Sequence, residues 1–213
     1  MISGAALLFD LDGTLIDSTP VVMRCWRRWC AEYGISAQAF ARVHAHGRPA
    51  ADLVAELLPP DRRDEGLARI VELEVGDLDG VVALPGAHDL LATLPADRWA
   101  IVTSCTAPLA RARLAHTGIT APALVTASDI TRGKPDPEPY LLGAKRLGVP
   151  PEDCVVVEDA PAGLASARAA GMRTVAVLTT HSPADLAGAD LLAPALTGLR
   201  AGPAPDGVAI TAC

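Results

Sequence analysis

The stretch Leu8-Phe9-Asp10-Leu11-Asp12-Gly13-Thr14-Leu15 decides the fold. The apolar run from Ala5 to Phe9 predicts a strand buried on both faces, as in a parallel sheet. Such sheets bind ligands beyond the carboxyl ends of their strands, where Asp10 is expected. Strand alternation would turn Asp10 and Asp12 to one side, and Gly13 permits a sharp turn. Two carboxylates this close repel each other unless a cation lies between them or one is protonated, although a plain Asp-Gly turn fits the same residues.

The rest of the chain divides into a helical part and an alternating part. Between residues 16 and 84 the periodicity predicts helices and no convincing strand; these helices are expected at 18–34, with Ser18 as a hydroxyl cap, 50–58 and 61–77. From residue 85 onward strands alternate with helices, which indicates βαβ units and a parallel sheet. Strands are expected at 99–103, 123–126, 155–157 and 174–178, and helices at 88–94, 107–117, 137–147 and 160–170. A last strand is expected at 208–211, after a loop or loose tail at 198–207.

Composition limits the function classes. Of the 213 residues, 50% are hydrophobic, enough for a sizeable core, and the net charge of −7 argues against a general binder of nucleic acid or anionic membranes. The five cysteines form no Cys-x-x-Cys pair, so we expect reduced thiols in a cytoplasmic protein. Because Asp10 and Asp12 interrupt the apolar run near the N-terminus, no signal peptide is expected there, and no stretch is long enough to span a membrane.

Polar groups follow several of the expected strands. Asp10 follows the first, Thr103 and Ser104 follow the next, and Glu158-Asp159 follow the strand at 155–157, while Lys134 precedes a helix. Since the carboxyl ends of parallel strands meet at one sheet edge, these groups could converge. Carboxylates suit a hard cation such as Mg²⁺, a hydroxyl and a lysine suit phosphoryl oxygens, and a carboxylate can form an aspartyl-phosphate. Taken singly, each also fits a capping residue, a solvated turn lysine or a charge pair at a helix start.

In this order and spacing the residues resemble the haloacid dehalogenase (HAD) superfamily. Asp-Leu-Asp-Gly-Thr at 10–14 resembles its first motif, Ile101-Val102-Thr103 the second, Gly-Lys-Pro-Asp-Pro at 133–137 the third, and Glu158-Asp159 the fourth. The resemblance implies a Rossmann-like three-layer α/β core with a parallel sheet, formed by residues 1–15 and 85–213. It also implies a small α-helical cap domain at 16–84, inserted after the first strand as a lid.

The resemblance also implies roles for the motif residues. Asp10 would attack phosphorus as the nucleophile, and Asp12 would serve as general acid and then as general base. Thr103, Ser104 through its backbone, and Lys134 would hold the phosphoryl group. Mg²⁺ would be held by Asp10, the Asp12 backbone carbonyl and Asp159, with Glu158 as a ligand or close by.

Within the insert, His46-Gly47-Arg48 resembles a segment of sugar- and polyol-phosphate phosphatases and is the candidate substrate-recognition patch; the alternative is a solvated loop. The related β-phosphoglucomutases carry a lid histidine where this chain has Val22 and a lid arginine where it has Ala50. Both differences favour water as the acceptor of the phosphoryl group. Two aromatic residues, Trp26 and Trp29, are expected to pack within the insert.

The sequence thus predicts a HAD-family phosphoric monoester hydrolase, Mg²⁺-dependent and acting on a small phosphorylated sugar or polyol. A phosphomutase of the β-phosphoglucomutase type is the alternative, and a non-catalytic HAD-fold binding module is a third hypothesis, disfavoured by the complete motif set. We expect a small phosphorylated metabolite as partner, no nucleic acid and no membrane, and a monomer or weak homo-oligomer.

Overall fold

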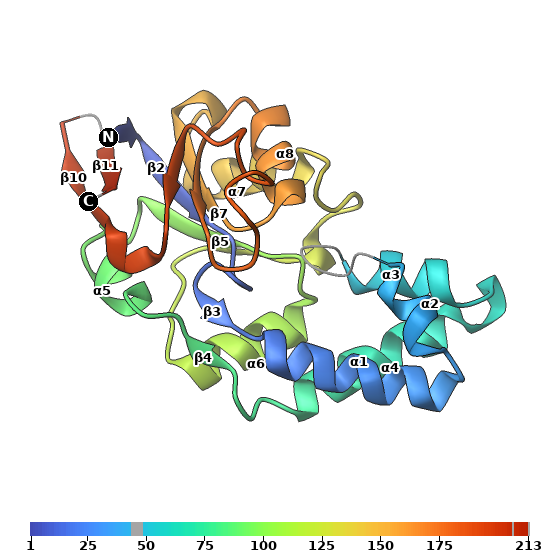
Figure 1. Ribbon diagram of the computed structural model, residues 1–213. Coiled ribbons are helices and arrows are strands. Elements are labelled where there is room, and N and C mark those ends of the chain that lie inside the picture. Colours follow the sequence, from blue (N-terminus) through green and yellow to red (C-terminus); the bar gives the residue numbers. More distant parts are fainter. Residues whose placement is uncertain (44–48, 206, 213) are drawn as a thin grey trace.

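The computed structural model describes residues 1–43, 49–205 and 207–212, and its centre is a six-stranded parallel sheet with strand order β6-β5-β2-β7-β8-β9 (Figure 1). The strands are β2 (Ala6–Phe9), β5 (Trp99–Val102), β6 (Leu124–Val125), β7 (Cys154–Glu158), β8 (Arg173–Val177) and β9 (Leu191–Ala193). Every residue of β2 is buried, as its apolar run predicts. The α/β fold class is confirmed, and the short edge strand β9 is an addition to the predicted set.

Alternate residues of the central strands belong to two separate hydrophobic clusters. Leu8 and Val156 point into the cluster with Tyr140, under helices α7 (Glu138–Leu147) and α8 (Pro161–Ala169). On the other face Leu7 and Val157 pack with residues of α5 (Ala87–Ala92) and α6 (Ala107–Thr117). This period of two is what a strand buried on both sides requires. Three layers result, with helices on both faces of the sheet.

The C-terminal residues correct one expectation. Instead of a loop or loose tail, residues 199–204 form strand β10 (Leu199–Ala204), which pairs with β11 (Gly207–Ala212). Strand β11 also pairs with β1 (Ile2–Gly4), so that both chain ends lie in one antiparallel sheet of three strands (Figure 1). Val208 and Ile210 are fully buried in the same cluster as Leu7, so this small sheet covers part of the core.

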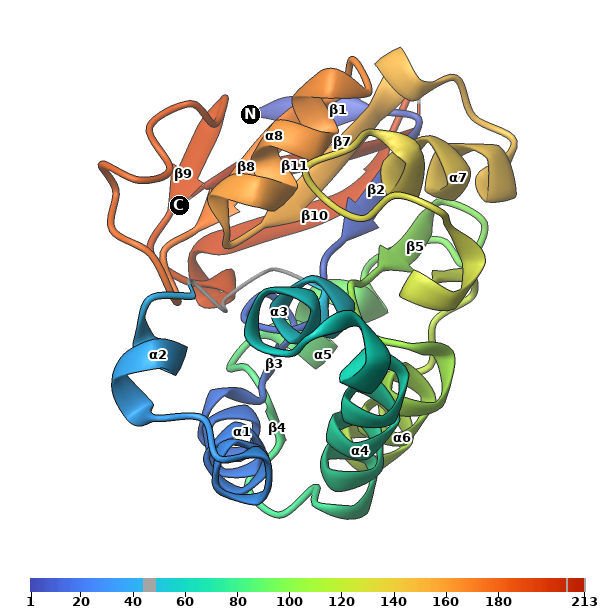
Figure 2. The same ribbon diagram turned by 90° about the vertical axis from the view of Figure 1, so that its right-hand side faces the viewer.

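The segment after β2 is mainly helical, as predicted, but the expectation of no strand between residues 16 and 84 is wrong at both ends of this range. Two short strands, β3 (Ile16–Asp17) and β4 (Val82–Ala83), pair where it leaves and rejoins the core. Figure 2 shows its helices beside the sheet rather than within the layers. They are α1 (Thr19–Tyr33), α2 (Ala37–Ala41), α3 (Ala50–Leu57), the 3-10 turn η1 (Pro60–Arg62) and α4 (Arg63–Gly76). Short 3-10 turns also occur at 127–129, 151–153 and 196–198.

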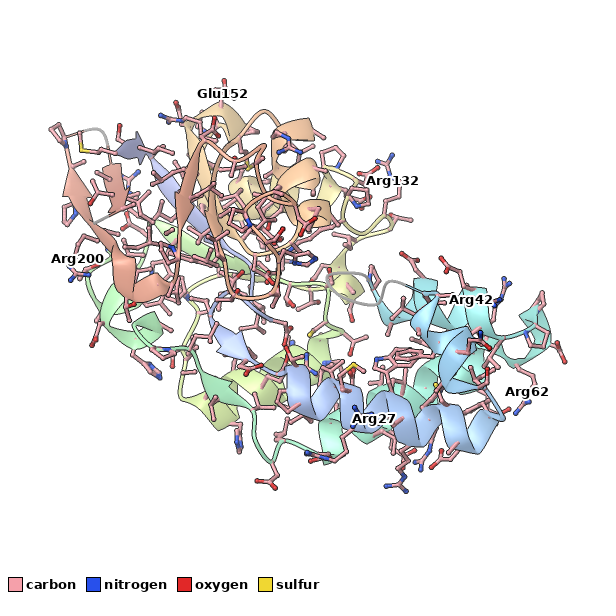
Figure 3. The ribbon with its side chains drawn as sticks, viewed as in Figure 1. Arg27, Arg42, Arg62, Arg132, Glu152 and Arg200 are labelled. Carbon is pink, nitrogen blue, oxygen red and sulfur yellow. The ribbon has the colours of Figure 1, made fainter. Side chains whose placement is uncertain are left out.

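Packing within this helical segment follows the predicted pattern. Trp26 and Trp29 are buried and meet edge to face, with ring centroids 5.2 Å apart, and Trp29 Nε1 donates to the carbonyl of Gly66 at 2.8 Å. Arg27 lies on the exposed face of α1 (Figure 3). The predicted hydroxyl cap of α1 is wrong, since the Ser18 side chain makes no capping hydrogen bond and donates instead to Asp12.

Candidate active site

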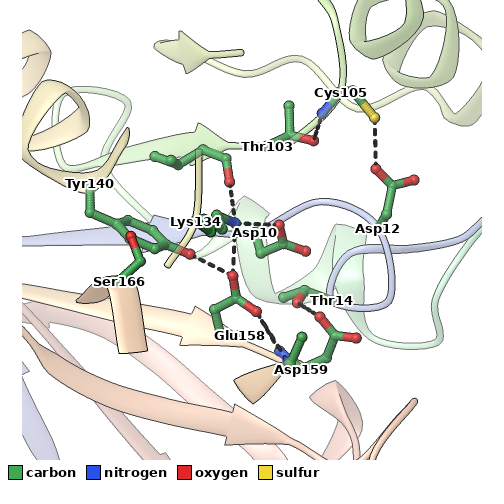
Figure 4. Close-up of polar contacts among 12 residues, drawn as sticks. Asp10, Asp12, Thr14, Thr103, Cys105, Lys134, Tyr140, Glu158, Asp159 and Ser166 are labelled. Atoms are coloured by element: carbon green, nitrogen blue, oxygen red, sulfur yellow. Dashed lines mark hydrogen bonds and ion pairs between the residues drawn. The ribbon is translucent and has the colours of Figure 1, made fainter. Parts of the chain in front are cut away.

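A buried lysine from the third predicted motif contacts each of the other three motifs. Lys134 Nζ donates to Asp10 Oδ1 at 2.7 Å, to Glu158 Oε1 at 2.7 Å and to the carbonyl of Val102 at 3.0 Å (Figure 4). Asp10 follows β2, Val102 ends β5 and Glu158 ends β7, so three neighbouring strands deliver these groups to one sheet edge. The convergence of the strand ends is therefore as the parallel sheet predicts.

Three carboxylates form a cluster at this edge. One oxygen from each of Asp10, Glu158 and Asp159 lies within 4.8 Å of the others, and all three residues are buried. Burial raises the pKa of Asp10 well above its usual range, and the carboxylates of Glu158 and Asp159 raise it further, although Lys134 opposes them. Carboxylate oxygens are the ligands that Mg²⁺ prefers, so the donor set fits a hard divalent cation whose charge would relieve this repulsion.

Both side-chain oxygens of Glu158 accept hydrogen bonds. Besides Lys134, its Oε1 accepts from Tyr140 Oη at 2.8 Å, and its Oε2 accepts from the backbone N–H groups of Asp159 at 3.0 Å and Ala160 at 3.2 Å. Both oxygens are thus engaged, which favours a supporting position beside a metal rather than direct coordination. Asp159 accepts from Thr14 Oγ1 at 3.2 Å and from Thr180 Oγ1.

The side chain of Asp12 lies apart from this carboxylate cluster. Its Oδ1 accepts from Ser18 Oγ at 2.6 Å and from Arg113 Nη1 at 2.7 Å, while its Oδ2 accepts from Cys105 Sγ at 3.0 Å. Figure 4 shows Asp12 turned toward Cys105, away from Glu158 and Asp159. Burial raises the pKa of the Cys105 thiol well above its usual range, and Asp12 adds to this, so the thiol remains a donor.

Sequence reasoning missed two charged residues near Asp12. Arg113 in α6 and Glu74 in α4 are both buried, and Arg113 Nη2 lies 3.7 Å from Glu74 Oε1. Burial raises the pKa of Glu74 to about 7, although Arg113 opposes it. Burial lowers the pKa of Arg113, but Asp12 and its other neighbours outweigh this and raise it overall. Charged residues inside expected helices carry no local signal of burial, because they are normally solvated.

A cavity of about 300 Å³ lies between the sheet edge and the helical segment. The predicted core-motif residues line one side of it: Asp10, Asp12, Thr103, Ser104, Lys134, Glu158 and Asp159. The opposite side is largely apolar and comes from the helical segment: Val22, Met23, Trp26, Leu53, Leu67 and Val71. The candidate recognition patch His46-Gly47-Arg48 lies outside the described residues.

Comparisons with known proteins identify the protein family to which this fold and site belong. The family model described as haloacid dehalogenase-like hydrolase matches residues 5–171. The chain is 43% identical to hexitol phosphatase A of Escherichia coli over 193 residues, which covers 84% of this chain and 83% of that protein. It is 36% identical to glycerol-1-phosphate phosphohydrolase 2 of Saccharomyces cerevisiae, covering 82% of this chain and 75% of the relative. The chain belongs to the haloacid dehalogenase-like hydrolase family.

Within this family the chain is a phosphoric monoester hydrolase, which confirms the predicted enzyme class. A solved structure of β-phosphoglucomutase from Clostridium difficile matches with a TM-score of 0.78 and 25% identity, covering 92% of each chain. The predicted subgroup, with sugar phosphatases and β-phosphoglucomutases as relatives, is therefore also confirmed. No helix among the described residues is long and apolar enough to cross a membrane.

Proposed function

We propose that this chain is a Mg²⁺-dependent phosphatase that hydrolyses a small phosphorylated sugar or polyol through an aspartyl-phosphate on Asp10. The single observation that carries the proposal is the contact of Lys134 with both Asp10 and Glu158 at the rim of the cavity. A buried cation beside a carboxylate suits a site that must bring an anionic substrate to an anionic nucleophile. The names of the curated relatives, which include hexitol and glycerol 1-phosphate phosphatases, support this substrate class.

The proposed reaction has two halves. An Asp10 oxygen attacks phosphorus and the bond from phosphorus to the ester oxygen breaks, while Asp12, which enters this half in its protonated form, gives its proton to the departing alkoxide. Asp12, now ionised, takes a proton from water, which attacks the phosphorus of the aspartyl-phosphate and releases inorganic phosphate with Asp10 restored. Lys134, the Thr103 hydroxyl and the Ser104 backbone would hold the phosphoryl oxygens in both halves.

Asp10, Asp159 and the Asp12 backbone carbonyl would hold Mg²⁺, with Glu158 supporting them, and the ion would neutralise charge on the phosphoryl group. The buried carboxylate cluster is the observation that supports this ligand set.

Residues 16–84 would form the cap domain, and residues 1–15 with 85–213 the core. The cavity between them supports this division, because closure of the cap over the cavity would enclose the substrate and exclude bulk water. His46, Gly47 and Arg48 remain our candidates for reading the substrate hydroxyls.

The similarity to β-phosphoglucomutase favours a phosphomutase as the second candidate function. A mutase must hold a second phosphate in the cap. Val22 and Ala50, both in the cavity wall, offer no cation for it where the mutases carry histidine and arginine. Incubation with glucose 1-phosphate should therefore yield inorganic phosphate or nothing, and accumulation of glucose 6-phosphate stimulated by glucose 1,6-bisphosphate would establish the mutase instead.

We further propose that the enzyme works in the cytoplasm as a monomer or weak homo-oligomer, without nucleic-acid or membrane partners. Its acidic net charge of −7 and the free thiols of the four described cysteines support this proposal.

Phosphate release from a panel of phosphate esters, measured with Mg²⁺ and after exhaustive chelation, tests the proposed function. We expect release from hexitol or glycerol phosphates with Mg²⁺, loss of activity with EDTA and recovery when Mg²⁺ is restored. Full activity after chelation would contradict the metal requirement, and release from none of these esters would contradict the substrate class.

A further inference from the structure

A largely buried polar cluster, which includes the proposed acid, joins the helical segment to the core. It consists of Glu74 from α4, Arg113 from α6, Asp12 and Cys105. Helices α4 and α6 pack against each other, so the cluster spans the contact between the two parts of the chain (Figure 2). No HAD motif includes Glu74 or Arg113.

The contacts of this cluster fix the Asp12 carboxylate in one orientation. Arg113 Nη1 donates to Asp12 Oδ1 at 2.7 Å and lies 3.1 Å from Cys105 Sγ, whose thiol donates to Asp12 Oδ2. Each carboxylate oxygen thus has a donor on the α6 side, and the donors themselves touch. A carboxylate that accepts hydrogen bonds at both oxygens cannot rotate freely about its terminal side-chain torsion. The distribution of this torsion angle is broad when the group has no such contacts.

This arrangement does not maximise stability. The Arg113 side chain is only 3% exposed, yet its Nε and Nη2 have no hydrogen-bond partner among the described residues. Glu74 balances part of the charge from 3.7 Å, too far for a hydrogen bond. Buried donors without partners destabilise a fold, and well-packed apolar groups in their place are often neutral or stabilising. An arginine in this position therefore points to a role in the reaction.

We propose that Arg113 is a positioning residue that aims Asp12 at the ester oxygen of the substrate, and that Glu74 holds Arg113 from the helical segment. The inference rests on the proposed function, in which Asp12 protonates the leaving alkoxide. Because Glu74 belongs to the helical segment, the orientation of the acid then depends on where that segment sits on the core.

A leaving-group comparison tests this role. An alkoxide leaves only with a proton from the acid, whereas p-nitrophenolate leaves without one. The ratio of kcat/KM for glycerol 1-phosphate to kcat/KM for p-nitrophenyl phosphate therefore measures acid catalysis in the phosphorylation of Asp10.

We expect Arg113→Gln to lower this ratio at least tenfold, Arg113→Lys to restore part of it, and Glu74→Gln to lower it severalfold. Arg111→Gln, on the exposed side of the same helix, should leave it unchanged.

Asp12→Asn provides the reference, since it should lower the ratio most. Equal losses for both substrates in the Arg113 and Glu74 variants, with a selective loss in Asp12→Asn, would overturn the positioning role and leave the proposed function standing. Equal losses in Asp12→Asn as well would overturn the acid role of Asp12 and this inference with it. If Arg113→Gln does not fold, the Arg113→Lys and Glu74→Gln proteins decide between these outcomes, once thermal unfolding has shown that they are folded.

Discussion

At the residue scale, the buried charges of the site depend on one another. Lys134 faces two carboxylates, and its pKa is raised well above its usual range because Asp10 and Glu158 outweigh the effect of burial. Removing one member of such a group leaves the others buried without compensation, which costs several kcal/mol. The groups proposed to serve the reaction therefore also affect the stability of the fold at this edge of the sheet.

Glu74 gives a pH-dependent prediction. Its pKa of about 7 lies above the ordinary value of 4.5, so the folded protein binds the proton more tightly than the unfolded chain. The resulting stability is complete below about pH 4.5 and is lost as the pH rises toward 7. We expect Glu74→Gln to remove this loss, so that its unfolding free energy relative to wild type rises by roughly 2–3 kcal/mol between pH 4.5 and 8, at about 1.4 kcal/mol per pKa unit.

Urea titrations of both proteins across this pH range measure the difference. A difference that stays constant with pH would show that Glu74 titrates normally.

Sequence reasoning could place the residues that follow strands but not those inside helices. Asp10, Glu158 and Asp159 come directly after apolar runs, and the parallel arrangement alone brings them together. Arg113 and Glu74 lie in helices whose charged residues usually face solvent, so only the packing of α4 on α6 reveals their burial. The contact of Arg113 with Asp12 was unpredictable for the same reason.

At the element scale, helix α8 approaches the site so closely that one of its positions admits only glycine. A Cβ on Gly163 would lie 1.7 Å from Glu158 Oε1. We expect Gly163→Ala to displace Glu158 from Lys134, lowering both the Tm and, at least tenfold, the kcat/KM for phosphate esters. Gly76→Ala is the matched control, since it lies at the exposed end of α4 with nothing within 4 Å of its Cβ. If Gly163→Ala were as active as wild type, catalysis would not require Glu158 in its observed position.

The terminal sheet gives a second prediction for elements. Ile210 on β11 is fully buried opposite Ile2, so we expect Ile210→Ala to lower the unfolding free energy by about 2–4 kcal/mol. Thr211→Ala on the partly exposed side should change it by less than about 1 kcal/mol. Denaturant unfolding measures both, and equal small effects would mean that the chain end contributes little to the core.

The loop expectation for residues 198–207 failed because strand formation there depends on a partner. Gly202 and Pro203 weaken any local strand signal, and β10 lies at the edge of its sheet, where proline is tolerated. By contrast, the predicted helix at 107–117 matches α6 residue for residue, since proline near its start and Gly118 after its end mark both limits.

At the scale of the whole molecule, the order of elements along the chain was predictable and the cavity was not. The fold class and the helical insert follow from composition shifts and periodicity, which are local properties. The cavity wall combines Trp26 and Leu67 of the helical segment with Thr103 and Lys134 of the core, and only tertiary packing brings these together.

The central claim is that this molecule hydrolyses small phosphate esters with Asp10 as the nucleophile. The most direct test compares inorganic phosphate release from a hexitol phosphate by wild type and by Asp10→Asn, in Mg²⁺, with circular dichroism to check the fold. We predict turnover by wild type and less than about one percent of it in the folded Asp10→Asn variant, because each 1.36 kcal/mol of lost stabilisation costs tenfold and covalent catalysis supplies several such steps. Phosphate release by Asp10→Asn at a rate near that of wild type would contradict the account.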